Sequence, residues 1–190
     1  MKRQILTAVM AAAAALAMVG CDKATSDTPK IPANEPMSME LLARTASGFT
    51  VGQQMSTRTA YVFYDMQCPH CGHLWESAKP LQANMKFVWV PVGVLSRASI
   101  AQGSTILASA DPAKAMDEHK ASLLNNSGGM AADSDAMDKF EGKIKANTEL
   151  LTALKANSVP FVVTKDPQTG ELITSTGALP TEDLRAFLKL

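Results

Sequence analysis

The stretch Tyr61-Val62-Phe63-Tyr64-Asp65-Met66-Gln67-Cys68-Pro69-His70-Cys71 joins an apolar, β-prone run to two cysteines that are separated by two residues. The apolar run predicts a buried strand that ends at Asp65. After Cys71, the apolar residues fall on one helical face: Leu74, Trp75, Ala78 and Leu81. The cysteine pair is therefore expected at the junction of a strand and a helix.

This position suits the cysteine pair for redox chemistry. The free N–H groups and the dipole of a helix N-terminus favour an anion, so Cys68 is expected to have a lowered pKa and to be the nucleophile. Protonated His70 would stabilise the thiolate and make the Cys68–Cys71 disulfide a stronger oxidant. Pro69 fits the first helical position, and Cys71 is expected to be the resolving thiol. The disulfide itself would be the reactive group, with no cofactor and no metal.

A metal site is the main alternative, because Cys-x-x-Cys is also half of a zinc site. Cys68, His70, Cys71 and His73 could together bind zinc or copper. The sequence has no second Cys-x-x-Cys and no paired His motif to complete a structural zinc site. A lipoprotein that handles copper or zinc therefore stays as an alternative hypothesis.

Other residues near the pair have simpler interpretations. His73 and His119 are expected to be surface or partly buried residues and not ligands. Trp75 is expected in the core. Asp65 is expected to be a turn residue that could also tune Cys71.

The first twenty residues predict export. Lys2 and Arg3 precede an apolar run over residues 5–19, which is typical of a signal peptide at residues 1–20 and short for a membrane-spanning helix. Met18-Val19-Gly20-Cys21 then resembles a bacterial lipobox, so Cys21 is the predicted lipidation site; a plain secretory peptide is the alternative. We expect a periplasmic protein that is anchored to the inner or outer membrane.

Composition excludes some functions. Lys and Arg number 18, Asp and Glu number 18, and the formal net charge is +0, so no strong field attracts nucleic acid. The 11 methionines form no dense Met-x-x-Met cluster and are expected to fill the core.

The rest of the chain divides into a tether and one folded domain. Residues 21–37 are polar and rich in proline, which is typical of a tether. Residues 38–59 are expected to be a lead-in segment with a helix from Ser38 to Arg44 and a brief strand, and residues 60–190 the domain. Its further predicted elements are a strand at 86–90, helices at 99–110 and 112–124, a helical region at 137–154 interrupted near Asn147, strands at 161–164 and 172–174, and a helix at 181–190 capped by Thr181.

Three motifs accompany this order of elements: Phe63-Tyr64-Asp65, Val92-Gly93-Val94 and Ile106-Leu107-Ala108-Ser109-Ala110-Asp111-Pro112-Ala113-Lys114. The order and the motifs together resemble the DsbC and DsbG family of periplasmic disulfide isomerases, with DsbG the closer. The resemblance spans about residues 61–190. It implies an α/β, thioredoxin-like fold with a helical insertion between the two halves. It also implies a thiol-disulfide oxidoreductase whose partners are proteins with thiols or disulfides and a membrane redox protein.

The chain departs from this family in several ways. Residues 21–60 are too few for the N-terminal dimerisation domain of DsbC and DsbG, so a dimer of that kind is not expected. Pro69-His70, and Val159 before Pro160, resemble the oxidase DsbA, which leaves the direction of electron flow open. Val62 stands where thioredoxin and DsbA place a buried acidic residue.

The resemblance also implies how a client would bind. It predicts a cis peptide bond between Val159 and Pro160, close to the cysteines, with the main chain of Val159 pairing with an extended substrate. The non-enzymatic alternative is a tethered, peptide-binding chaperone.

Overall fold

The computed structural model describes residues 35–190. The predicted signal peptide, the lipidation site at Cys21 and most of the predicted tether lie outside the described residues. No helix within residues 35–190 combines the length and the apolar character that crossing a bilayer requires.

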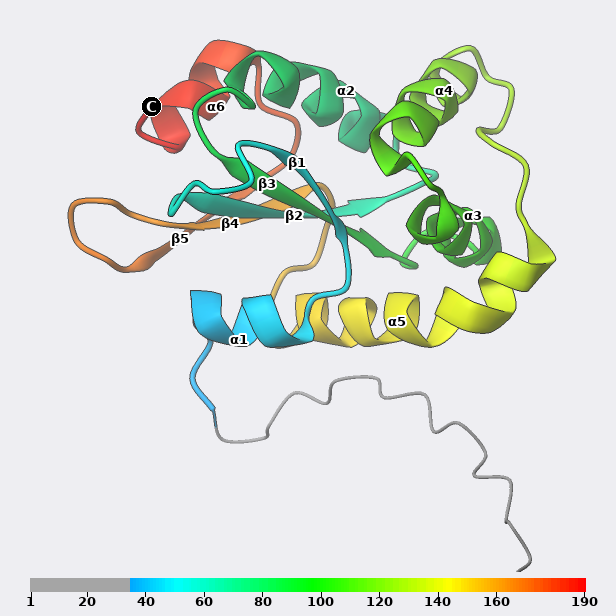
Figure 1. Ribbon diagram of the computed structural model, residues 1–190, viewed down its shortest axis with the longest axis horizontal. Coiled ribbons are helices and arrows are strands. Elements are labelled where there is room, and N and C mark those ends of the chain that lie inside the picture. The colour runs from blue at the N-terminus through cyan, green and yellow to red at the C-terminus, as the bar shows by residue number, and fades with distance from the viewer. Residues whose placement is uncertain (1–34) are drawn as a thin grey trace, which may run out of the picture.

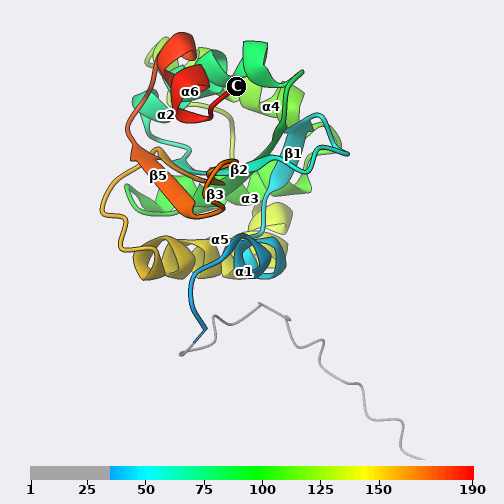
Figure 2. The ribbon, with the colours of Figure 1, turned by 90° about the vertical axis from the view of Figure 1, so that its left-hand side faces the viewer.

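Within residues 35–190, a five-stranded sheet forms the middle layer, and helices cover both of its faces (Figure 1, Figure 2). In the described part of the chain the strand order is β1-β3-β2-β4-β5, with β2 and β3 parallel and the other neighbouring pairs antiparallel. The strands are β1 (Phe49–Gly52), β2 (Thr59–Asp65), β3 (Lys86–Val92), β4 (Phe161–Lys165) and β5 (Leu172–Thr176).

The helices form the two outer layers. In Figure 2, α2, α4 and α6 lie on one side of the sheet, and α1 and α5 on the other. Helices α3, α4 and α5 are inserted between β3 and β4, so the predicted thioredoxin-like fold with a helical insertion is confirmed. The helices are α1 (Met39–Thr45), α2 (Pro69–Ala78) with the 3₁₀ turn η1 (Lys79–Leu81), α3 (Arg97–Ala108), α4 (Pro112–Leu124), α5 (Ser134–Ala153) and α6 (Thr181–Phe187).

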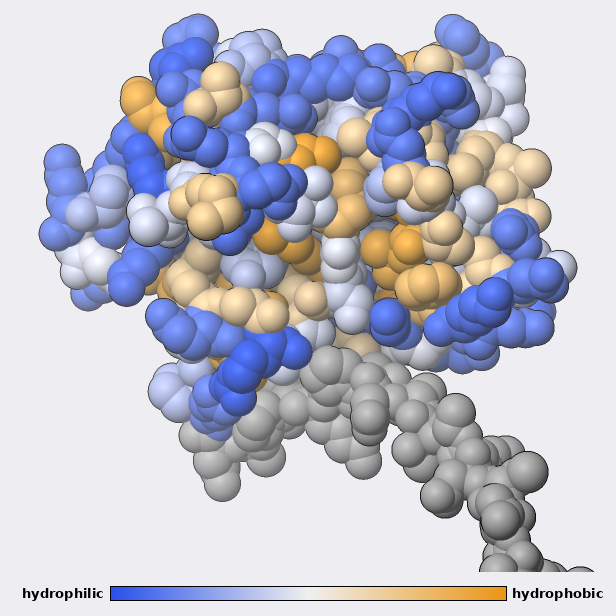
Figure 3. Space-filling model, in the orientation of Figure 1, coloured by the Kyte–Doolittle hydropathy of each residue, from blue (hydrophilic) through white to orange (hydrophobic). Residues whose placement is uncertain are grey.

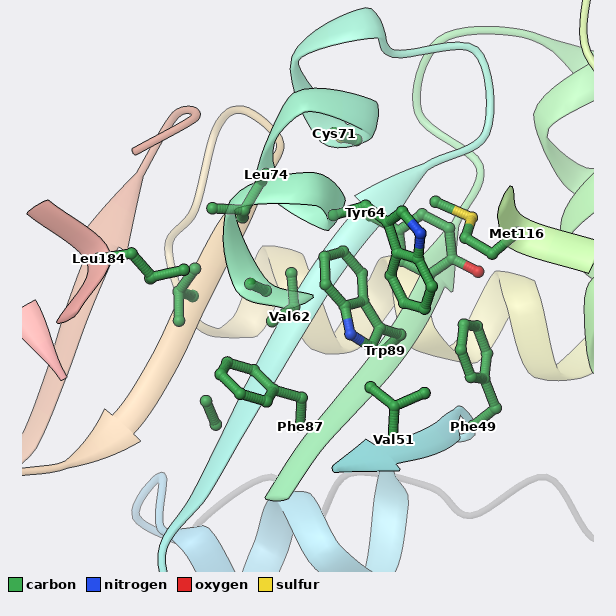
Figure 4. Close-up of a cluster of buried hydrophobic side chains, with 14 of the residues drawn as sticks. Phe49, Val51, Val62, Tyr64, Cys71, Leu74, Phe87, Trp89, Met116 and Leu184 are labelled. Carbon is green, nitrogen blue, oxygen red and sulfur yellow. The ribbon is translucent and has the colours of Figure 1, made fainter. Parts of the chain in front are cut away.

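Strand β2 is buried on both faces, which explains its unbroken apolar run. Val62 and Tyr64 point into the core below α2 and α6, while Tyr61 and Phe63 pack on the side of α1 and α5. Figure 4 shows the first of these cores, which surrounds Trp89. Trp75 packs against Trp89 with ring centroids 4.8 Å apart, which confirms its predicted core position.

The segment predicted as a lead-in contributes to the same sheet. Ser38 caps α1 by accepting a hydrogen bond from the Leu41 N–H at 3.1 Å, as expected for an N-cap serine. Strand β1 pairs antiparallel with β3, with Phe49 opposite Trp89. Residues 39–52 therefore pack as part of the domain.

The predicted interruption near Asn147 is wrong, because α5 runs unbroken from Ser134 to Ala153. The Asn147 side chain is fully buried: its Oδ1 accepts from Ser47 N–H at 2.9 Å, and its Nδ2 donates to Ser47 O at 2.7 Å and Pro91 O at 2.9 Å. These tertiary bonds outweigh the weak helix propensity of asparagine.

The last helix also differs from the prediction. It ends at Phe187, and Thr181 is its first residue, preceded by Pro180 at the N-cap position. The Thr181 hydroxyl donates instead to Ser77 O at 3.1 Å, which joins α6 to the end of α2. Thr181 is therefore a tertiary contact and not a cap.

We expect Asn147→Ala to lower the free energy of unfolding by about 2–4 kcal/mol, because the groups it bonds would lose their partner in the interior. Urea denaturation measures this loss. Asn157→Ala is the matched control, since Asn157 is exposed, and it should change stability by less than about 0.5 kcal/mol. Equal effects of the two changes would contradict the assigned role of Asn147.

Candidate active site

The two cysteines lie where β2 passes into α2, at the C-terminal end of the central strand (Figure 1). The Cys68 N–H donates to Asp65 O at 3.1 Å and closes a tight turn. Cys68 is the N-cap residue of α2, and Pro69 occupies the first helical position, where its missing N–H has no cost. The predicted junction of strand and helix is confirmed.

The sulfur of Cys68 lies close to the segment before β4, and little of the residue is exposed. Both cysteines are free thiols, and Cys68 is 5% exposed. Its Sγ accepts the Cys71 main-chain N–H at 3.4 Å and lies 3.7 Å from Val159 O. Hydrogen bonding from the Cys71 side chain, then from main-chain N–H groups of Cys71 and His70, lowers the pKa of Cys68 to about 7 against the opposing effects of burial and of the Asp65 charge. A large fraction of Cys68 is therefore thiolate near neutral pH.

Cys71 has the opposite character. The residue is 1% exposed and faces the core (Figure 4). Burial raises its pKa well above that of a free thiol, and its hydrogen bond to Cys68 raises it further. The pair is thus asymmetric, with one reactive thiolate and one protonated thiol.

The two residues between the cysteines are exposed. The His70 ring lies 6.4 Å from the His73 ring, centroid to centroid. Within residues 35–190, Cys68 Sγ accepts hydrogen bonds from Cys71, and the His70 ring donates none to it. The predicted stabilisation of the thiolate by His70 therefore stays a prediction.

The peptide bond between Val159 and Pro160 is cis, as the family resemblance implied. Pro160 is buried directly before β4, and Val159 is partly buried beside both cores. The Val159 carbonyl lies next to the Cys68 sulfur, so the structure brings together the two parts of the site that the sequence separates by 91 residues. Binding of a client by Val159 and Pro160 stays a prediction.

Asp65 does more than end a strand. It is 1% exposed, its Oδ1 accepts from Gln67 N–H at 2.8 Å, and its Oδ2 accepts from Val94 N–H at 2.9 Å and Leu95 N–H at 3.0 Å. The carboxylate joins the cysteine turn to the loop after β3. Its charge also acts to raise the pKa values of Cys68 and Cys71. The sequence analysis allowed an effect of Asp65 on Cys71, but it could not indicate the bonds to the loop, because those partners lie 29 and 30 residues away.

His119 was predicted to be at the surface or partly buried, and this is wrong. The residue is 1% exposed, its Nε2 donates to Met66 O at 2.7 Å, and its Nδ1 accepts from Met130 N–H at 3.0 Å. This pattern requires the neutral ring with its proton on Nε2. His119 joins helix α4 and the loop after it to the cysteine turn, a role that no local signal in the sequence indicates.

Two glutamines and a glycine complete this junction. Gln67 Nε2 donates to Gln102 Oε1 at 2.6 Å, and Gln102 Nε2 donates to Gly128 O at 2.9 Å and Met130 O at 2.8 Å. Gly129 has a φ of +85°, and a Cβ there would lie 2.3 Å from His119 Cε1. The helical insertion therefore holds the turn that carries Cys68.

Within residues 35–190, no three side chains of His, Cys, Asp or Glu lie close enough together to hold a metal ion. His73 is exposed on α2, and both ring nitrogens of His119 are engaged by main-chain groups.

Comparison with known proteins places these features in a family. Residues 50–190 match the family described as the thioredoxin-like domain. The chain is 26% identical over 143 residues to the thiol:disulfide interchange protein DsbG of Pseudomonas aeruginosa, covering 72% of this chain and 53% of that protein. It is 36% identical over 73 residues to DsbG of Escherichia coli, covering 37% of this chain and 29% of that protein. The chain thus spans about half the length of the first relative and less than a third of the second.

Solved structures with the same fold include proteins with other names. The structure of Pseudomonas aeruginosa DsbA2 has a TM-score of 0.59 at 19% identity, covering 74% of this chain and 91% of that chain. Proteus mirabilis ScsC in a transitional conformation has a TM-score of 0.58 at 18% identity, covering 79% of this chain and 74% of that chain. These likenesses show the fold alone.

We expect Cys71→Ala to raise the pKa of Cys68 above its value of about 7, because the hydrogen bond from the Cys71 side chain is the largest effect that lowers it. The pH dependence of thiolate absorbance, or of the rate of alkylation by iodoacetamide, measures the pKa. Cys71→Ser keeps a side-chain hydrogen-bond donor, so it should raise the pKa of Cys68 less than Cys71→Ala does. A Cys68 pKa that is the same in all three proteins would contradict this account.

We expect the free energy of unfolding to fall as the pH drops because of His119. Burial lowers the pKa of His119 in the folded protein. In the unfolded chain the His119 pKa is the ordinary value of about 6.5. Below this pH, the unfolded chain therefore binds more protons than the folded protein. The contribution of His119 to stability is therefore complete above the unfolded pKa. It is lost as the pH falls from the unfolded pKa toward the lower pKa of the folded protein. Urea titrations at about pH 7.5 and about pH 5.5 measure the decline.

Two variants test this assignment. His119→Gln keeps a donor for Met66 O and does not titrate, so its stability should depend less on pH over this range. His73→Gln is the control, because His73 is exposed, and it should follow the wild type. If His119→Gln declines as steeply as the wild type, another group causes the pH dependence.

Proposed function

The chain belongs to the thioredoxin-like family, and from this premise we propose that it is a thiol-disulfide oxidoreductase of the DsbG-like branch that exchanges disulfides with protein thiols through Cys68. One observation carries the proposal. A thiol with a pKa lowered to about 7 lies at the start of α2, beside a buried thiol whose pKa is raised. This asymmetry supplies an attacking thiolate and a reserve thiol to resolve the intermediate.

In the reducing or isomerising direction, the Cys68 thiolate attacks a client disulfide. A bond forms between Cys68 Sγ and one client sulfur, and the other client sulfur leaves as a thiolate. In a reduction, Cys71 then loses its proton and attacks Cys68 Sγ, which releases the first client sulfur as a thiolate and leaves the Cys68–Cys71 disulfide. In an isomerisation, another client thiolate attacks the client sulfur of the mixed disulfide instead, which forms a new client disulfide and releases Cys68 as a thiolate.

In the oxidising direction the same bonds change in reverse order. A client thiolate attacks Cys68 Sγ of the disulfide and expels the Cys71 sulfur, which takes up a proton because burial raises its pKa. A second client thiolate attacks the client sulfur of the mixed disulfide and releases Cys68 as a stabilised thiolate. The stability of this thiolate favours the oxidising direction.

Client binding is proposed at Val159 and Pro160. The Val159 carbonyl lies 3.7 Å from Cys68 Sγ, so an extended client strand that pairs with this main chain would bring its cysteine to the reactive sulfur. Main-chain pairing of this kind gives affinity with little dependence on the client's sequence.

We propose that the protein acts in the periplasm, with Cys21 lipidated and a membrane redox protein as its electron partner. The N-terminal sequence supports the export and the anchor. One protein of the same fold, 19% identical, is described as a periplasmic thioredoxin-like protein from Salmonella enterica serovar Typhimurium.

The first test is the reduction potential of the pair. Full-length protein with Cys21→Ser has two thiols, and after equilibration in glutathione buffers its oxidised fraction is measured by thiol alkylation. We expect a potential nearer that of DsbA, about −120 mV, than that of thioredoxin, about −270 mV, because the Cys68 thiolate is stabilised. A value near the thioredoxin end would instead indicate a reductase.

A trapping experiment separates the enzyme from the alternatives. Cys71→Ala should accumulate a mixed disulfide between Cys68 and a client protein, and Cys68→Ala should not. If the Cys68→Ala protein still protects an unfolded client from aggregation, the chaperone hypothesis is favoured. If Cys68 and Cys71 do not interconvert reversibly between two thiols and a disulfide, and metal co-purifies, the hypothesis of a protein that handles copper or zinc replaces the proposal.

A further inference from the structure

Helices α2 and α4 approach each other closely beside the resolving thiol. Gly72 follows Cys71 on α2 and is buried. A Cβ at Gly72 would lie 2.9 Å from Lys120 Cγ on α4. The absence of a side chain at Gly72 therefore lets the aliphatic part of Lys120 lie against the first turn of α2.

Lys120 is more buried than an ordinary surface lysine. Its side chain is 19% exposed, whereas that of Lys114, on the same helix, is 73% exposed. The Lys120 Nζ lies 2.9 Å from Glu76 Oε1. Glu76 lies four residues after Gly72, on the same face of α2. Lys120 thus contacts α2 at two points, of which one is apolar and one is charged.

Further charged groups hold the two helices together. Lys79 Nζ lies 2.8 Å from Glu76 Oε1. It also lies 2.5 Å from Asp117 Oδ1 on α4, which accepts a hydrogen bond from Trp75 Nε1 at 2.6 Å. The hydrogen bond from Lys120 is the largest effect on Glu76, and it lowers the pKa of this carboxyl group. Lys120 is therefore one member of a network of charges that joins α2 to α4.

This network lies above the core that contains Cys71. Figure 3 shows hydrophilic residues over α2 and α4 and apolar residues below them, toward the sheet. Met116, one turn before Lys120, is 2% exposed and belongs to the same buried cluster as Cys71 (Figure 4). Helix α4 therefore helps to close the core around Cys71, and Lys120 joins this part of α4 to α2.

The burial of Cys71 affects one step of the exchange. Cys71 must lose its proton before it attacks Cys68 Sγ, and burial disfavours the thiolate. A slow attack by Cys71 gives the mixed disulfide time to react with another client thiolate. The first route reduces the client and the second isomerises it, so the burial of Cys71 affects which of the two occurs.

We propose that Lys120 is a positioning residue that holds α4 against α2, keeps water away from Cys71 and so prolongs the mixed disulfide with the client. The inference rests on the proposed exchange reaction and adds a control of its second step. Removal of Lys120 should raise the thiolate fraction of Cys71. A tenfold rise in this fraction should increase the rate of the second step only about threefold, because a less basic thiolate is a weaker nucleophile.

The test follows the two steps separately in reduced full-length protein with Cys21→Ser. The reagent is dipyridyl disulfide, which is uncharged and releases pyridinethione, a product that absorbs light. Attack by the Cys68 thiolate forms a mixed disulfide between Cys68 and one pyridyl sulfur and releases the first pyridinethione. Attack by the Cys71 thiolate on Cys68 Sγ then forms the Cys68–Cys71 disulfide and releases the second. The two cysteines lose two electrons and two protons, and the reagent gains them.

We expect Lys120→Ala to increase the rate constant of the second release about threefold and to change that of the first by less than about twofold. The second release should also reach half of its maximal rate at a lower pH, because Cys71 becomes easier to ionise. Lys120→Arg keeps an aliphatic stem and a charge for Glu76, so it should restore the slow second release.

Two controls separate this role from other effects. Lys114→Ala removes an exposed lysine of α4 that pairs with Glu118 at 3.8 Å, and it should leave both rate constants unchanged. Asn147→Ala lowers stability from α5, on the other side of the sheet (Figure 2). It should leave the ratio of the two rate constants unchanged, so a general loss of stability is recognised.

Each outcome decides the inference. An unchanged or slower second release in Lys120→Ala overturns it and leaves the proposed function standing, as does a failure of Lys120→Arg to restore the slow second release. An equal change in the first release, or the same change in Lys114→Ala or Asn147→Ala, overturns it too. If the protein with Cys21→Ser alone gives no second release, and no reversible two-thiol transition in glutathione, the proposed function itself is wrong.

Discussion

The buried carboxylate of Asp65 is the constraint on which the reactive end of the molecule depends. A carboxylate that is 1% exposed must be stabilised by hydrogen bonds, and it accepts three from main-chain N–H groups in two segments. One bond orders the turn that carries Cys68, and two order the loop that carries Val94 and Leu95. Because both segments leave neighbouring strands, a single charged group sets the position of the turn that carries Cys68 relative to the loop after β3.

This arrangement has an electrostatic consequence. The Asp65 charge and the burial of the site both favour the protonated thiol at Cys68. The hydrogen bonds at the start of α2 favour the thiolate, and they prevail, since the pKa of Cys68 falls to about 7. At Cys71, one helical turn deeper, burial prevails and the pKa rises. The difference between the two pKa values comes from the hydrogen bonds that Cys68 receives, of which the one from the Cys71 side chain has the largest effect, and from the deeper burial of Cys71.

The fold and the centre of the site could be predicted largely from local patterns. The apolar run of β2, the helical face after Cys71 and the serine that precedes α1 are signals read within a few residues, and the structure agrees with them. The cis bond before Pro160 followed only from the family resemblance. The failures have one cause: the contacts of Asn147, His119 and Thr181 join residues that are far apart in the chain. A sequence pattern gives the residue type at such positions but not the partner.

The direction of electron flow does not follow from the family resemblance, because fold and potential depend on different parts of the structure. The sheet and the insertion determine where Cys68 lies, through Gln102, His119 and the packing of α3 to α5. The potential depends on the few groups within hydrogen-bonding distance of the two sulfurs. A chain can therefore resemble isomerases in its fold and an oxidase in its Pro69-His70 dipeptide without contradiction. Under the proposed function, the residues around the sulfurs, and not the fold, decide whether the disulfide is given to a client or taken from it.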